Sequence, residues 1–268
     1  MATVDAVQTS VYAALSRAAY QGEATPLGWS ILETSAPSTN GFAATAFRNE
    51  TTGEVVIAYR GTDEFKDLTG ADLDLALQKV PNGQLTSAQD FFDTIANKYS
   101  DATINITGHS LGGALAQLIA ASNTQVSAYT FNAPGVLEIL RNIDPDRFAN
   151  VDPSTFTNVN NFNMRLDVVS THGDQLGTSF NYEPGSLEGM KFFAGLVGSL
   201  VNPTVGLVIL GNSALGQHYI DRVQEAIATE KPTDLIRGYT YDETTDAWYQ
   251  PSTEGSGILS PVDAAIDA

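Results

Sequence analysis

The spacing of hydrophobic residues changes along the chain, and each spacing predicts a different element. Val7, Val11 and Leu15 recur at helical intervals, so residues 4–19 are predicted to form an amphipathic helix. Residues 41–61 form two runs of strand-forming residues around a Thr-Thr-Gly turn, which predicts two strands. Further strands are predicted at 103–107, at 126–131 and within 156–169, and further helices at 86–99, 111–121 and around 213–230. Thr86 or Ser87 is expected to cap the helix over 86–99.

Strands that alternate with helices indicate an α/β fold with a mostly parallel central sheet. No repeat or low-complexity linker divides the 268 residues, so we expect one domain over residues 1–268. Residues 192–211 carry no charge over twenty positions, a length that could span a bilayer. Asn202-Pro203 interrupts this stretch and no basic residues anchor its flanks, which favours short buried helices or an apolar flap over an integral membrane segment.

The charge balance narrows the range of partners. Acidic residues outnumber basic ones by 31 to 13, which gives a formal net charge of −18. Such a chain repels nucleic acid and anionic membrane surfaces, so nucleic-acid binding is set aside. Three acidic residues, Asp67, Asp72 and Asp74, lie close together in the sequence. They are interpreted as the acidic face of an amphipathic helix, with bound structural calcium as the alternative.

The chain has no cysteine, which excludes disulfides, thiolate zinc sites and a cysteine nucleophile. It has only three histidines, which disfavours a multi-histidine metal site. The first twenty residues lack a basic start followed by an apolar block, so no Sec signal peptide is expected. We expect an extracellular protein exported by another route, with the small and acidic residues of the C-terminal tail compatible with an export signal; a cytoplasmic location stays open.

One pentapeptide carries a specific chemical signal. Gly108-His109-Ser110-Leu111-Gly112 fits the G-x-S-x-G nucleophile elbow, between a predicted strand and a predicted helix. A sharp turn there forces the serine into a strained backbone and brings the flanking glycines so close that side chains would clash. The helix start aims backbone N–H groups at the serine, so the N–H of Leu111 is the first expected oxyanion donor.

A nucleophilic serine needs a base and an acid that orients the base. His172 and His218 follow Ser110, and His218 is favoured because His172 lies close in sequence to the best acid candidates. Asp167 is the favoured acid since it follows a predicted strand, and catalytic groups of open α/β sheets gather at the carboxyl ends of strands. Asp174 is the second candidate for the acid and Asp152 the third.

Four motifs occur in the order and rough spacing of a known family: AYRGT at 58–62, TGHSLGG at 107–113, RLDVV at 165–169 and QHY at 217–219. Over residues 40–220 the chain resembles the class 3 lipases, the fungal-lipase-like branch of the α/β-hydrolases, and most closely bacterial lipases and phospholipases A1. The resemblance implies an α/β-hydrolase fold with helices on both sides of the sheet and an apolar lid-like insertion, at 63–80 or 186–212. It also implies Ser110 as nucleophile, Asp167 as acid, His218 as base and Thr62 as the second oxyanion donor beside Leu111.

The predicted activity is hydrolysis of lipid-like carboxylic esters through an acyl-enzyme, without a cofactor. The expected partner is a hydrophobic ester or a lipid–water interface. Triacylglycerol lipase or esterase, phospholipase A1 and polyester hydrolase share the same triad, and acyltransferases and serine peptidases use similar parts. A catalytically inactive binding protein on the same scaffold is the alternative of another class. The oligomeric state is left open.

Overall fold

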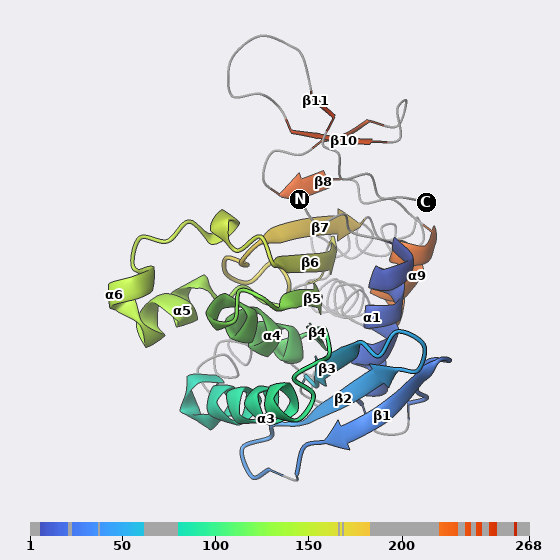
Figure 1. Cartoon of the computed structure of the whole chain (residues 1–268). Helices are drawn as coiled ribbons and strands as arrows, with labels where there is room; N and C mark the ends of the chain where they lie inside the picture. Colours follow the sequence, from blue (N-terminus) through green and yellow to red (C-terminus); the bar gives the residue numbers. More distant parts are fainter. Residues whose placement is uncertain are drawn as a thin grey trace, which may run out of the picture.

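Eight strands form the central sheet in the order β1-β2-β3-β4-β5-β6-β7-β8, so strand order follows the sequence (Figure 1). The computed structural model describes residues 6–20, 23–36, 38–61, 80–165, 167, 169–182, 220–229, 234–236, 240–242, 247–250 and 260–261. Strands β3 to β7 are parallel, and the antiparallel β1, β2 and β8 complete the two edges. The strand bounds are β1 Trp29–Thr34, β2 Ala44–Asn49, β3 Val55–Tyr59, β4 Ile104–His109, β5 Ser127–Phe131, β6 Val159–Met164, β7 Thr178–Tyr182 and β8 Asp234–Ile236.

Helices cover both faces of this sheet (Figure 1). Helices α1 (Ala6–Ala18) and α9 (Ile220–Thr229) contact each other on one face. The other face holds α3 (Leu85–Lys98) and α4 (Leu111–Ser122), with α5 (Leu137–Ile143), α6 (Pro145–Phe148) and the short turns η2 (Val80–Gln84) and η3 (Pro153–Thr155). A separate three-stranded sheet follows, made of β9 (Thr240–Asp242), β10 (Ala247–Gln250) and β11 (Ser260–Pro261).

The core divides into two layers because successive side chains of a strand point to opposite faces. Within β3, Val55, Ile57 and Tyr59 pack against α3 and α4, whereas Val56 and Ala58 pack against α1. All five of these residues are fully buried, as expected for a parallel strand covered by helices on both sides. Helix α4 is buried along almost its whole length, which explains its uninterrupted apolar composition.

The structure confirms the predicted α/β architecture with a mostly parallel sheet. The predicted cap of α3 is wrong: a π-helical turn over Val80–Gln84 leads directly into the helix, and Gln84 at the N-cap already has helical φ and ψ. Thr86 and Ser87 therefore lie inside the helix, and the Ser87 hydroxyl accepts a hydrogen bond from Asn40 instead. Strands β1 and β7 were not predicted.

Several predictions concern residues that the structure does not describe. The uncharged stretch 192–211 and the acidic cluster of Asp67, Asp72 and Asp74 lie outside the described residues, as do both candidate lid segments apart from Val80. In the described part of the chain, no helix combines the length and apolar character needed to cross a bilayer. That residues 1–268 form one domain stays a prediction.

Candidate active site

The turn between β4 and α4 has the geometry expected for a nucleophile elbow. Ser110 lies directly between the last residue of β4 and the first residue of α4, with φ 59° and ψ −130°. An L-residue with positive φ is strained, and such strain persists only where the surroundings enforce it. A β-carbon on Gly108 would lie 2.3 Å from the Gly112 carbonyl oxygen, so the two glycines permit the turn to close.

Ser110 is fully buried at this turn. Its backbone N–H donates to the carbonyl of Phe131 at 2.9 Å, which ties the elbow to the end of the neighbouring strand β5. Among the described residues the Ser110 hydroxyl has no hydrogen-bond partner. Buried hydroxyls are normally satisfied by a neighbouring group, and the predicted base of this serine, His218, lies outside the described residues.

Leu111, the predicted oxyanion donor, is the first residue of α4 and is buried beside the serine. The first N–H groups of an α-helix have no acceptor within the helix, and the positive end of the helix dipole lies at the same place. The N–H groups of Gly113 and Ala114 donate back to the Ser110 carbonyl, which fixes the start of the helix. The position of Leu111 is therefore compatible with donation to a developing oxyanion.

Asp167 is fully buried three residues beyond the end of β6. It is the one buried acidic residue in the described part of the chain. The Ser170 N–H donates to Asp167 Oδ2 at 2.7 Å, and the Asp167 N–H donates to the Met164 carbonyl at 3.2 Å. β4 and β6 run in the same direction. Ser110 and Asp167 therefore both follow the carboxyl ends of their strands, on the same side of the sheet.

The other two acid candidates lie in different settings. Asp174 is exposed, and its carbonyl accepts the N–H of Leu137. Asp152 is also exposed and caps η3, where its Oδ1 accepts the Ser154 N–H at 2.8 Å. Asp152 precedes β6 and so lies toward the amino ends of the strands, away from the edge that carries Ser110.

Thr62 and His218 lie outside the described residues. Their sequence neighbours are described: α9 begins at Ile220, and Gly61 is buried against the elbow. A β-carbon on Gly61 would lie 3.2 Å from Ser110 Cβ, so the residue before Thr62 lies against the nucleophile. His172 is half-buried in the loop after Asp167, where its carbonyl accepts the Gly135 N–H at 2.7 Å.

Two residues near the nucleophile were not identified as functional from the sequence. The Tyr20 hydroxyl lies 3.0 Å from His109 Nδ1 and accepts the Gly61 N–H at 3.2 Å. The histidine inside the elbow motif was a visible signal, but no sequence pattern marks Tyr20, which is 89 residues away from His109.

Buried amide side chains hold the loops at this edge of the sheet. Gln117 of α4 donates to the Pro134 carbonyl at 2.9 Å and accepts the Leu176 N–H at 3.0 Å. Asn132, the other non-glycine residue with positive φ in the described part, accepts the Met164 N–H at 2.8 Å through its side chain. Satisfied buried hydrogen bonds of this kind specify one arrangement of the loops, so the strand ends that carry Ser110 and Asp167 are fixed relative to each other.

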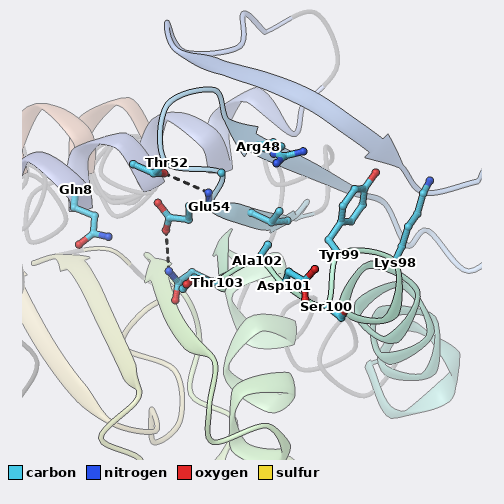
Figure 2. Close-up of a pocket in the computed structure, with 13 residues that line it drawn as sticks. Gln8, Arg48, Thr52, Glu54, Lys98, Tyr99, Ser100, Asp101, Ala102 and Thr103 are labelled. Carbon is cyan, nitrogen blue, oxygen red and sulfur yellow. Dashed lines mark hydrogen bonds between the residues drawn. The ribbon is translucent and has the colours of Figure 1, made fainter.

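A polar recess of about 630 Å³ lies at the amino ends of strands β3 and β4, opposite the strand ends that carry Ser110 and Asp167 (Figure 2). Its wall includes Arg48, Tyr99 and Glu54, and the Asn105 amide donates to Glu54 at 2.8 Å. Asn105 is near the start of β4 and Ser110 follows its end, so the recess is separate from the nucleophile turn. No cluster of three or more histidine, aspartate or glutamate residues suited to a metal occurs among the described residues.

A strained serine in a strand–turn–helix elbow, at the carboxyl edge of a mostly parallel sheet, defines the chain as an α/β-hydrolase. The sequence matches the phospholipase-like family described as the Tle-like phospholipase domain over residues 11–202, and the chain belongs to this family. This membership confirms the predicted kinship with lipases and phospholipases. It supports an ester hydrolase that acts on lipids.

Similar solved structures include three fungal lipases. The Rhizomucor miehei lipase propeptide complex is 17% identical with a TM-score of 0.45, over 66% of this chain and 68% of that one. The Rhizopus microsporus var. chinensis lipase is 18% identical with a TM-score of 0.44, over 67% and 76% of the two chains. A triacylglycerol lipase from Penicillium expansum is 18% identical with a TM-score of 0.44, over 68% and 82%. No curated protein matches the sequence.

Proposed function

We propose that the protein hydrolyses the carboxylic ester bonds of lipids, with glycerophospholipids as the preferred class and Ser110 as the nucleophile. The observation that carries the proposal is the fully buried Ser110, whose backbone has positive φ in the turn between β4 and α4. Membership of a phospholipase-like family supports the choice of phospholipid over other esters.

In the proposed reaction, Ser110 Oγ attacks the acyl carbonyl while His218 accepts the hydroxyl proton. The carbonyl oxygen becomes an oxyanion that accepts hydrogen bonds from the N–H groups of Leu111 and Thr62. The C–O bond to the glycerol then breaks, and His218 returns its proton to the leaving alcohol. Water next attacks the acyl-enzyme, with His218 again as base, and releases the fatty acid and free Ser110.

Asp167 has the role of orienting His218 and stabilising its protonated form. A buried carboxylate suits this role because electrostatic interactions strengthen where water is excluded. The Ser170 N–H already holds one carboxylate oxygen at 2.7 Å, which limits rotation of the group. The position of Asp167 at the same sheet edge as Ser110 supports this assignment.

The test compares wild-type protein with Ser110→Ala on three substrates: dioleoylphosphatidylcholine vesicles, a trioctanoylglycerol emulsion and soluble p-nitrophenyl acetate. The proposal predicts fatty-acid release from the vesicles as the fastest reaction and its loss in Ser110→Ala. Faster hydrolysis of the triacylglycerol would replace the substrate class but keep the nucleophile. Equal activity of the two proteins on every substrate would refute the proposal.

A further inference from the structure

The phenol of Tyr20 connects two segments of the candidate site. Tyr20 follows the end of α1, and its hydroxyl is within hydrogen-bond distance of both His109 Nδ1, at 3.0 Å, and the Gly61 N–H, at 3.2 Å. His109 immediately precedes Ser110, and Gly61 immediately precedes Thr62. One side chain just beyond the N-terminal helix therefore contacts the residue before the nucleophile and the residue before the predicted second oxyanion donor.

The Tyr20 hydroxyl oxygen takes part in both hydrogen bonds. It accepts the Gly61 N–H, and it shares a hydrogen with His109 Nδ1 in a direction that depends on the imidazole tautomer. Both backbone segments are therefore held to the same oxygen atom.

The packing around Gly61 leaves little freedom for this segment. A β-carbon there would lie 2.8 Å from the His109 carbonyl oxygen and 2.8 Å from the Tyr20 hydroxyl oxygen. Gly61 and Ser110 are both buried. The end of the β3 segment is thus pressed against the elbow, and the Tyr20 hydrogen bond sets the point of contact.

We infer that Tyr20 is a positioning residue for the oxyanion hole: it holds Gly61 against His109, and so fixes the elbow that carries Ser110 and the Leu111 N–H. This inference rests on the proposed function. Oxyanion donors act through placement at the developing charge, so loss of the Tyr20 hydroxyl reduces stabilisation of the transition state more than binding of the substrate.

The experiment removes the hydroxyl alone, in Tyr20→Phe, and measures p-nitrophenyl butyrate hydrolysis and the labelling rate of Ser110 by a p-nitrophenyl alkylphosphonate. The phosphonate places its P=O oxygen in the oxyanion hole, so labelling reports on the hole without catalytic turnover. A displaced donor predicts that kcat and the labelling rate both fall about 10- to 100-fold, with KM changed less than about twofold.

Tyr12→Phe is the matched control, because it also removes a single tyrosine hydroxyl from the N-terminal segment, in this case from α1 itself. The Tyr12 hydroxyl is hydrogen-bonded to Glu54 and Asn105 at the amino ends of the strands. Loss of this hydroxyl is therefore expected to change stability but neither kcat nor the labelling rate. Wild-type kcat in Tyr20→Phe, or equal losses in both variants, would overturn the inference. If wild-type protein itself is not labelled at Ser110, the proposed function fails as well; normal labelling of both wild type and Tyr20→Phe refutes the inference alone.

Discussion

Gly108 and Gly112 approach each other so closely that a β-carbon on Gly108 would lie 2.3 Å from the Gly112 carbonyl oxygen. Gly112 in turn faces β3, where its own β-carbon would lie 2.1 Å from the Tyr59 carbonyl oxygen. Real β-carbons do not occur at such distances from backbone atoms. The elbow therefore depends on contact between the end of β4, the first turn of α4 and the end of β3.

Gly108→Ala is predicted to destabilise the fold and to reduce activity, because the added methyl group must displace backbone rather than a flexible side chain. Overpacking of this kind typically costs about 1–3 kcal/mol. Urea unfolding and ester hydrolysis measure the two effects. Gly28→Ala is the control: its β-carbon meets nothing within 4 Å, but its φ is +81°. It should cost about 1 kcal/mol of stability and leave kcat unchanged. Equal effects of the two variants on kcat would contradict the role assigned to the elbow.

Asp167→Asn is predicted to lower kcat by about 10³- to 10⁴-fold with little loss of stability. Asparagine can still accept the Ser170 N–H, but it removes the charge that stabilises a protonated His218. Asp174→Asn and Asp152→Asn are matched controls on exposed carboxylates and should keep kcat within about twofold. If either control loses as much activity as Asp167→Asn, the acid has been misassigned.

The pH dependence of kcat/KM distinguishes the two candidate histidines. The base must be neutral to accept the Ser110 proton, so activity should rise with pH through the range around 6.5 that is typical of histidine. His218→Ala should abolish this rise together with the activity. His172→Ala should keep the profile. A profile that is flat across this range in wild-type protein, or one lost in His172→Ala, would argue against His218.

Three buried tyrosines predict loss of stability at alkaline pH. Burial raises the pKa of Tyr12, Tyr59 and Tyr182 above the ordinary value of 10.0, and the nearby Glu54 carboxylate raises that of Tyr12 further. A raised pKa in the folded state means that stability is complete below pH 10 and decreases as pH rises beyond it, by about 1.4 kcal/mol per pH unit for each tyrosine. Urea midpoints measured from about pH 8 to about pH 11 should decrease in wild-type protein and decrease less steeply in Tyr12→Phe. Parallel slopes would contradict the contribution of Tyr12.

The nucleophile turn could be predicted from sequence because its steric requirements lie within five adjacent residues. The glycines that admit the turn, the strand before it and the apolar helix after it all belong to one short segment, and the structure agrees with each of them. Asp167 could be selected because it follows a strand that ends at the same edge of the sheet. The first prediction depended on a local pattern alone, and the second on a general rule about where parallel strands end.

Features that depend on distant contacts were not predictable in this way. Strand β1 was missed because a bulge between Ile31 and Glu33 breaks its alternation, and Ile31 is 54% exposed at the sheet edge. Strand β7 is only five residues long, and its Ser179 and Asn181 are polar although buried, so its composition does not mark a core strand. Tyr20 reaches His109 only through the packing of α1 on the sheet.

Covalent labelling with a fluorophosphonate, followed by mass spectrometry of the digested protein, shows whether Ser110 is an activated nucleophile. Stoichiometric modification is expected at Ser110; it should depend on His218 and be lost after denaturation, since free serine hydroxyls do not react appreciably. Absence of labelling on the folded protein, or modification at another residue with Ser110 intact, would contradict the proposed role of Ser110.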